Sequence, residues 1–270
     1  MTAAPMNKFE LARQFGKALS TFKIDLALLH LQKVVRKKNY IRAVIYHDTP
    51  KNFSTSLEKH FAFYQKHFSP VSKQDLNRFF QTGHWNKPKP GLMITFDDGL
   101  KSNFEIALPL LEKFGFVGWF FIPTGLVDAP GQMSWKEIQK LDQNHEIGCH
   151  TQSHLRMQEG LSKEILQKEI GESKKILENK LSHPVDLFCW VGGELQTYTR
   201  SAHNMIQKTG YHYAFMTNSK AIGPKTNPYF LDRTYVEPFW DIKEVTFMLS
   251  GMIDLLYSKK RRQIIYQLGF

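Results

Sequence analysis

The sequence predicts a parallel α/β fold, and three observations support this prediction. Apolar, β-branched segments alternate along the chain with segments of helical periodicity, which is typical of parallel sheets covered by helices. Residues 116–122 are almost continuously apolar, as strands buried on both faces are. Polar residues suited to catalysis follow several expected strands, and in barrels of parallel strands these ends share one rim.

The residue pattern sets the order of the elements. The expected strands are 41–46, 92–96, 116–122, 146–149, 187–190, 213–217 and 230–236. The expected helices are 56–68, 72–80, 103–114, one starting at 134, 162–180, 199–209 and 241–257. Ser134 with Glu137 and Asp241 with Glu244 have capping-box spacing, so each pair marks a helix start. Gly115 is the expected cap at the end of one helix.

Composition limits the class of protein and its partners. The chain has 270 residues, of which 42% are hydrophobic, enough for one large domain with or without an appendage. Its net charge of +11 favours an anionic partner, such as a phosphate-bearing substrate, an acidic glycan, a membrane surface or a nucleic acid. A basic surface without a specific partner explains the charge equally well. Cys149 and Cys189 lie in apolar segments, so we expect two buried thiols and no disulfide framework.

The amino-terminal region predicts an amphipathic helix within residues 7–38. Its apolar residues recur at spacings of three and four: Phe15, Ala18, Leu19, Phe22, Leu26 and Leu29. Such a helix either packs on the outside of the domain or rests on an anionic membrane face. The sequence shows neither an apolar signal core nor a run of about 18 apolar residues, so we expect a cytoplasmic protein without a spanning helix. We divide the chain into a helical extension (1–39), a main domain (40–258) and a basic tail (259–270) that is a solvated run or an anionic contact.

The other segments are organised around residues 92–99. This expected buried strand ends in Asp97, Asp98 and Gly99. Neighbouring residues of a strand point to opposite faces, but a turn at Gly99 can bring both acids to one rim. Two adjacent carboxylates do not both ionise cheaply unless a cation neutralises one of them. The segment therefore predicts either a solvated turn or a cation site.

Histidines follow two other expected strands. His47 comes after 41–46, and His150 and His154 come after 146–149. Two imidazoles and one carboxylate suit a divalent metal with open positions, and zinc and iron(II) both accept this set. Each motif alone is more often structural, but the three together at strand ends favour a metallohydrolase. In such an enzyme a carboxylate accepts a proton from water and a histidine protonates a leaving nitrogen.

Two of these segments resemble a known family. Residues 95–99, Thr-Phe-Asp-Asp-Gly, and 150–154, His-Thr-Gln-Ser-His, resemble the first two motifs of the polysaccharide deacetylases, the NodB-homology family called carbohydrate esterase family 4. The similarity runs from about residue 42 to residue 236, and Tyr46-His47 resembles the subgroup of poly-N-acetylglucosamine deacetylases. The resemblance implies a distorted (β/α)7-type barrel, with a deacetylase-like catalytic domain at 40–258. It also implies metal-dependent removal of an acyl group, usually N-acetyl, from a sugar.

The resemblance further implies residue roles and a cofactor. The metal would be zinc, with iron, cobalt, nickel or manganese as alternatives. Backbone N–H groups near the third motif would help to stabilise an oxyanion. The implied residues are Asp97 (general base), His47 (general acid), Asp98, His150 and His154 (metal ligands), and Gly192, Gly193, Trp190 and Arg233 (oxyanion or substrate binding).

The chain departs from the family pattern at two places. Residues 188–193, Phe-Cys-Trp-Val-Gly-Gly, stand where the third motif has proline or arginine, so the arginine that orients the base is missing there. We expect Arg233 to replace it from its own strand. The late Leu-x-His motif of common members is also absent, which favours His47 as the acid but leaves room for a degenerate site.

The predicted function is removal of an N-acetyl group from an amino sugar during surface glycan assembly, such as lipopolysaccharide biosynthesis. A nucleotide-linked or lipid-linked precursor, met in the cytoplasm or at the inner membrane face, fits the positive charge. The alternatives are a deformylase of a lipid-linked amino sugar and a catalytically silent protein that binds a glycan or lipid carrier. Nucleic-acid binding rests on charge alone, because no recognition motif is present, and we do not expect it.

Overall fold

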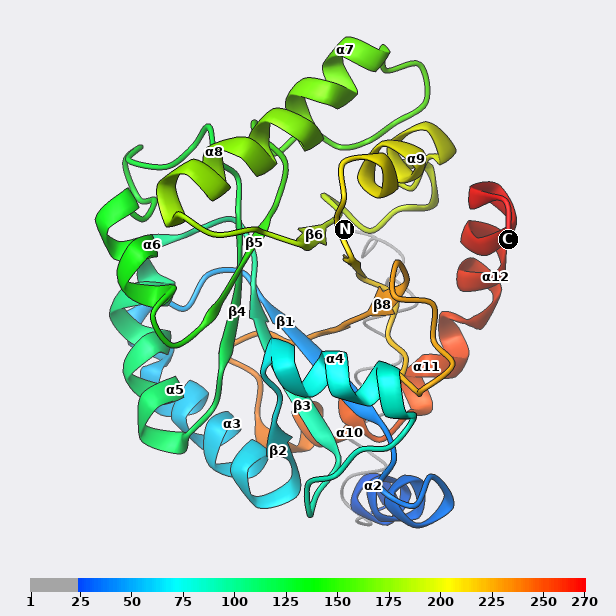
Figure 1. Ribbon diagram of the computed structural model, residues 1–270. Coiled ribbons are helices and arrows are strands. Elements are labelled where there is room, and N and C mark those ends of the chain that lie inside the picture. Colours follow the sequence, from blue (N-terminus) through cyan, green and yellow to red (C-terminus); the bar gives the residue numbers. More distant parts are fainter. Residues whose placement is uncertain (1–23) are drawn as a thin grey trace, which may run out of the picture.

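The computed structural model describes residues 24–270, which form a parallel barrel surrounded by helices (Figure 1). The strands follow each other in the order β8-β7-β6-β5-β4-β3-β1-β9, and β2 pairs with β3 beside this path. All pairings between these strands are parallel, as the alternation of elements predicted. The strands are β1 (Ile41–Tyr46), β2 (Ser69–Pro70), β3 (Gly91–Phe96), β4 (Gly118–Ile122), β5 (Glu146–Cys149), β6 (Leu187–Cys189), β7 (Tyr213–Met216), β8 (Leu231–Asp232) and β9 (Thr234–Tyr235).

The barrel closes at Arg233. β8 pairs with β7, whereas β9 pairs with β1 at the other end of the sheet. Only Arg233 separates these two short strands, so the chain passes from one edge of the sheet to the other at this residue. The single strand expected at 230–236 is therefore divided into two short consecutive strands, which together close the barrel between β7 and β1. This closure fits the predicted distorted (β/α)7-type barrel.

Side-chain alternation separates the inside of the barrel from the layer beneath the helices. On β4, Trp119 and Phe121 belong to the interior cluster, whereas Phe120 and Ile122 pack in the outer cluster against the helices. The interior cluster also includes Phe79 from α4, so this helix covers one end of the barrel and lies in front of the strands in Figure 1. Because the interior is filled with side chains, chemistry is confined to the rim.

Helices surround the barrel and include most of those predicted. Both capping boxes form, at Ser134–Glu137 and Asp241–Glu244, and Gly115 has the left-handed conformation of a helix cap. Two helical stretches contain π-helical segments, η2 and η3. The helical elements are α2 (Ile24–Val35), η1 (Lys51–Phe53), α3 (Ser54–His67), α4 (Lys73–Thr82), η2 (Asn103–Ala107), α5 (Leu108–Phe114), α6 (Trp135–Leu141), α7 (Lys163–Leu166), η3 (Gln167–Glu172), α8 (Ser173–Leu181), η4 (Leu195–Thr197), α9 (Arg200–Lys208), α10 (Ile242–Leu249), α11 (Met252–Leu256) and α12 (Ser258–Leu268).

The amino-terminal prediction is only partly covered by the structure. The expected stripe residues Phe15, Ala18, Leu19 and Phe22 lie outside the described residues. α2 continues the predicted helix and packs on α10, with Leu29 buried and Leu26 largely exposed. Within residues 24–270 we find no helix with the length and apolarity needed to cross a bilayer.

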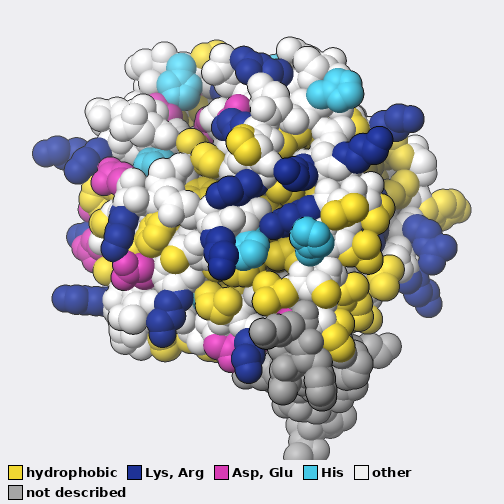
Figure 2. Space-filling model, turned by 90° about the horizontal axis from the view of Figure 1, so that it is seen from below, with side chains coloured by type: hydrophobic (Ala, Val, Ile, Leu, Met, Phe, Trp, Pro, Cys, Tyr) yellow, Lys and Arg dark blue, Asp and Glu magenta, His cyan; other side chains and the backbone are white. Residues whose placement is uncertain are grey.

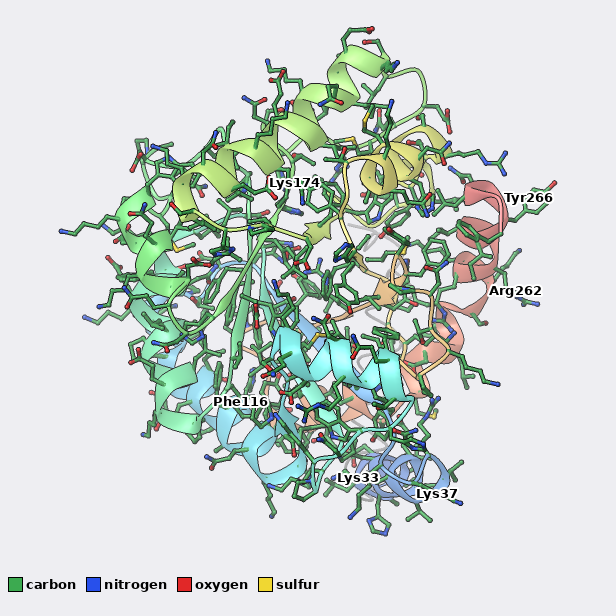
Figure 3. All side chains as sticks on the ribbon, viewed as in Figure 1. Lys33, Lys37, Phe116, Lys174, Arg262 and Tyr266 are labelled. Atoms are coloured by element: carbon green, nitrogen blue, oxygen red, sulfur yellow. The ribbon has the colours of Figure 1, made fainter. Side chains whose placement is uncertain are left out.

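The carboxyl-terminal residues 259–270, expected as a solvated run or an anionic contact, are mostly helical. They belong mostly to α12, which buries Ile264 and Leu268 against the domain. Arg261 donates hydrogen bonds to the carbonyl oxygens of residues 218, 219 and 254, so this cation is structural. Arg262 and Tyr266 point away from the molecule (Figure 3). The run of four basic residues, 259–262, suggested a solvated segment, although the apolar residues that dock the helix follow it in the sequence.

Packing of α12 leads to a stability prediction. Replacing the 2%-exposed Ile264 by alanine (Ile264→Ala) should lower the free energy of unfolding by about 2–5 kcal/mol, because it opens a cavity. Urea unfolding of the full chain measures this change. The matched control is Ile265→Ala, at a side chain 38% exposed, which should change the free energy by less than about 1 kcal/mol. Equal effects of the two substitutions would mean that α12 is not docked as described.

Candidate metal centre and active site

The rim at the carboxyl ends of the strands gathers the predicted site residues. Asp97 and Asp98 follow β3, His150 follows β5, and His47 follows β1. β1 and β3 are neighbours in the barrel, and β5 lies one strand beyond β4. Parallel pairing therefore brings together side chains that lie up to about a hundred residues apart in the sequence.

A left-handed backbone lets both carboxylates face this rim. Asp97 continues the strand alternation and points inward with Thr95, and its side chain is buried. Asp98 has a φ of 68°, and Gly99 has a φ of 65°. A non-glycine residue at positive φ is uncommon and strained, and such strain is often kept at functional sites. The turn expected at Gly99 thus begins one residue earlier, at Asp98.

Asp98, His150 and His154 form a convergent donor set. Nε2 of His154 lies 3.0 Å from Oδ1 of Asp98, and Nε2 of His150 lies 3.4 Å from the same oxygen. One ligand atom from each residue lies within 4.8 Å of the other two. Among the described residues, the buried Oδ1 of Asp98 has no partner in hydrogen-bond geometry. Two nitrogens and one oxygen converging on a common point are what a divalent cation requires.

A backbone carbonyl group fixes the tautomer of His150. Its Nδ1 lies 3.0 Å from the carbonyl oxygen of Cys189. A carbonyl oxygen only accepts, so Nδ1 carries the proton and donates it. The lone pair of Nε2 is then free to face Asp98. Backbone support of this kind is typical of metal-binding histidines.

The charges in this set stabilise each other. Burial alone would raise the pKa of Asp98, but the imidazoles of His150 and His154 hold the pKa of this carboxyl well below its usual range. The contact with Asp98 in turn raises the pKa of His154. Asp98 therefore remains ionised and available as an anionic ligand.

Asp97 is held by Arg233, as the sequence predicted for this arginine. Nη1 of Arg233 donates to Oδ1 of Asp97 at 2.6 Å, and Nη2 donates to Oδ2 at 2.8 Å. Burial acts to raise the pKa of Asp97, but the charge of Arg233, followed by smaller effects of His150 and His47, lowers it below the ordinary value. A fully buried carboxylate is thus kept ionised and fixed in orientation. Its role as a base stays a prediction.

His47 lies at the same rim and is partly exposed. Its ring packs on Tyr235, with 5.8 Å between the ring centroids. Its charge contributes to lowering the pKa of both Asp97 and Asp98, after the larger effects named above. This placement is suitable for an acid that faces the carboxylates, and the role itself stays a prediction.

The third-motif residues are placed less simply. Trp190 is 1% exposed and packs its indole against Phe188 and Tyr198 in the outer cluster, so it cannot contact a substrate as we expected. The N–H of Gly193 donates to the Glu194 carboxylate at 3.1 Å, so an oxyanion would have to displace this side chain. Gly192 has a φ of 82° and follows β6, and its oxyanion role stays a prediction.

Glu169, which the sequence analysis did not single out, anchors the loop of the two histidines. One oxygen of this buried carboxylate accepts from the backbone N–H of Gln152 at 3.0 Å and of Ser153 at 2.8 Å. The other accepts from the Ser153 hydroxyl at 2.8 Å. Glu169 lies in the π-helical segment η3, and π-bulges are frequent at functional sites. Its spacing from the motif gives no sequence signal.

The Glu169 contacts lead to a test of metal binding. Glu169→Gln exchanges one accepting oxygen for an amide donor, so the loop should loosen and zinc affinity should fall by roughly tenfold or more. Competition with a chelating dye measures this affinity without any turnover. Glu172→Gln, at an exposed position of the same segment, is the matched control and should bind zinc as the unmodified chain does. Unchanged zinc affinity in Glu169→Gln would contradict the anchoring role.

Comparisons with known proteins agree with the set of residues found at this rim. Residues 84–214 match the model of the polysaccharide deacetylase family. Over 148 residues the chain is 28% identical to YxkH of Bacillus subtilis (strain 168), a protein assigned to the polysaccharide deacetylases; the match covers 54% of this chain and 52% of that protein. The chain thus spans about half the length of this relative.

Two further matches cover more of their partners. The chain is 23% identical over 224 residues to the poly-beta-1,6-N-acetyl-D-glucosamine N-deacetylase of Staphylococcus aureus (strain MRSA252), covering 75% of this chain and 76% of that protein. Its fold matches the Streptococcus pyogenes deacetylase PplD with a TM-score of 0.69 and 17% identity, covering 78% of this chain and 98% of that one. These relatives are consistent with the Tyr-His subgroup. Residues 84–214 therefore carry a polysaccharide deacetylase domain of the NodB-homology kind, carbohydrate esterase family 4.

Proposed function

We propose that the protein is a metal-dependent hydrolase that removes an N-acetyl group from an amino sugar. The observation that carries this proposal is the convergence of two imidazole nitrogens on Oδ1 of Asp98, directly beside the Asp97 carboxylate that Arg233 fixes. Family members are generally divalent-metal enzymes, and the Asp98, His150 and His154 set fits such an ion. The donor types suit zinc first, and iron, cobalt, nickel or manganese remain compatible.

Each residue at the rim has a separate role in the proposed hydrolysis. Bound by Asp98, His150 and His154, a divalent ion would supply Lewis-acid polarisation and make water more acidic. Asp97 accepts a proton from the attacking water as the new C–O bond forms at the acyl carbon. His47 then donates a proton to the sugar nitrogen, so that the C–N bond breaks and leaves a free amine and acetate. Arg233 keeps Asp97 ionised and oriented for this transfer.

The relatives and the surface support a proposal for the substrate class. The Staphylococcus aureus relative is named for a poly-β-1,6-N-acetylglucosamine substrate, so we propose an N-acetylglucosamine unit for this chain. As a carrier we propose a nucleotide or lipid phosphate used in surface glycan assembly, in the cytoplasm or at the inner membrane face. A deformylase of a lipid-linked amino sugar is the nearest alternative.

A basic face supports a phosphate-bearing carrier or an anionic membrane. Figure 2 shows lysine and arginine side chains gathered among hydrophobic ones on the face seen from below. Nζ of Lys33 lies 3.2 Å from Nδ1 of His67. Burial, and then the charges of Lys33, Lys66 and Lys89, lower the pKa of His67 to about 4. Three lysines whose charges all act on one histidine favour an anionic partner.

A deacetylation assay tests the proposed reaction. Metal-loaded protein should release acetate from N-acetylglucosamine oligomers, UDP-linked N-acetylglucosamine or a polyprenyl-linked amino sugar, and formate release is measured in parallel. Asp98→Asn should lower the rate at least a hundredfold, because the ligand set loses its anion, and a chelator should have the same effect. Asp128→Asn, at an exposed loop residue that has the same φ of 68° as Asp98, is the matched control.

Two results would contradict this function. One is the absence of acetate and formate release from every one of these substrates with stoichiometric metal bound. The other is a chain that binds no metal while retaining its fold. The second result would favour the alternative of a catalytically silent protein that binds a glycan or a lipid carrier.

The buried ion pair gives a prediction of its own. Arg233→Ala should abolish measurable turnover and lower the free energy of unfolding by about 3–5 kcal/mol, because Asp97 is left buried and unpaired. Arg233→Lys, which keeps the charge but not the two-pronged contact, should retain more stability than activity. Urea unfolding and initial rates measured on the same samples separate the two effects. Full activity in Arg233→Ala would exclude the proposed orienting role.

A further inference from the structure

Helices α2 and α11 expose large apolar side chains to solvent. Five of these residues are each 53–70% exposed: Leu31, Val34 and Val35 of α2, and Leu255 and Leu256 of α11. Leu29 is the one apolar residue of α2 that is buried. A single exposed leucine needs no explanation, whereas a contiguous apolar group marks a surface that binds a partner.

The two helices line one groove near the amino end of β1. The groove has a volume of about 450 Å³, and its apolar lining is Leu28, Leu31 and Val35 of α2 with Met252 and Leu255 of α11. The buried Arg42, the second residue of β1, donates to Oε1 of Gln32 on α2 at 3.0 Å and to Oδ1 of Asp254 on α11 at 2.8 Å. Arg42 therefore fixes the two helices relative to each other, in the lower right part of Figure 1.

This surface carries exposed cations without opposing acids. Arg36 and Lys220 line the groove, and further exposed cations follow its two helices: Lys37, Lys38 and Lys259. Residues 24–38 and 252–256 contain two carboxylates; Asp25 is buried, and Asp254 forms an ion pair with Arg42. A second copy of the chain seated on this surface would bring like charges together, so self-association is disfavoured. A bilayer with anionic headgroups matches both the apolar and the cationic side chains.

We propose that α2 and α11 dock the protein on the surface of an anionic bilayer, with their exposed apolar side chains among the headgroups and the cations against lipid phosphates. This inference rests on the proposed function, which includes a membrane location, and names the surface that makes the contact. The candidate metal ligands follow the carboxyl ends of β3 and β5, whereas Arg42 places the docking surface near the amino end of β1. Docking therefore leaves the catalytic rim open to a sugar.

Sedimentation of the full chain with lipid vesicles tests this proposal. The chain should bind vesicles made of equal parts of phosphatidylglycerol and phosphatidylcholine at least about tenfold more tightly than vesicles of phosphatidylcholine alone, because the cations contribute only where headgroups are anionic. Leu255→Ser combined with Leu256→Ser should weaken binding to the anionic vesicles at least about tenfold, since both positions lose apolar area that the bilayer would bury. Ile165→Ser, at a 41%-exposed isoleucine of α7, is the matched control and should bind as the unmodified chain does.

Further arms separate docking from catalysis and from self-association. Asp98→Asn should bind the anionic vesicles as tightly as the unmodified chain, so a failure of deacetylation does not affect this test. Light scattering should give the unmodified chain and the double serine variant the same molar mass. A dimer that the double variant breaks, together with no vesicle binding, would assign the surface to a second copy and overturn the proposal. So would a double serine variant that binds the anionic vesicles as tightly as the unmodified chain.

Discussion

The buried ion pair between Arg233 and Asp97 is the interaction on which the barrel and its site both depend. At Arg233 the chain changes its pairing partner from β7 to β1. Its guanidinium therefore enters the barrel where the sheet closes. It also donates to the Thr95 hydroxyl at 3.0 Å, which itself donates to the Val44 carbonyl oxygen. One network therefore joins the closing strands, the strand of the carboxylates and the strand of His47. Removing either charge would leave its partner buried and unpaired, so the ionisation of the base and the closure of the barrel are coupled.

Backbone strain is concentrated where the donor atoms converge. Asp98, Thr151 and His154 have positive φ values of 68°, 66° and 61°. Each such residue costs on the order of 1–3 kcal/mol and persists only when its surroundings fix it. Glu169 provides part of that fixation through the two backbone N–H groups between the histidines, and the Thr151 hydroxyl accepts from the backbone N–H of Leu155 at 3.2 Å. The loop is thus held in a shape that its own residues disfavour, so His154 stays near Asp98.

The sequence was sufficient to predict the features that depend on local pattern. The period of apolar residues located the strands, and the polar residues at their ends include the candidate metal ligands that converge in the structure. Features that depend on distant partners were not predictable in this way. Residues 230–236 have the pattern of one strand, and only pairing with β7 on one side and β1 on the other divides them at Arg233. Glu169 lies in a helix that looks merely polar, because the backbone groups it binds come from another element. Strand alternation turns Trp190 outward, because the preceding Cys189 faces inward, so its indole packs in the outer cluster.

The altered third motif is compatible with a working site because the balance of charge around Asp97 is preserved. The inward residue of β6 is Cys189, whose thiol is fully buried, and burial raises its pKa well above the usual value, so it is neutral. Its sulfur accepts from Nη2 of Arg233 at 2.9 Å. An arginine contributed by the third motif would bring a second guanidinium toward Arg233, next to a single carboxylate. With a small neutral side chain on β6, the cation that orients Asp97 comes from the junction of β8 and β9, and one positive charge still faces one negative charge. Arg233 therefore takes the place of the arginine that the third motif lacks as the partner of Asp97.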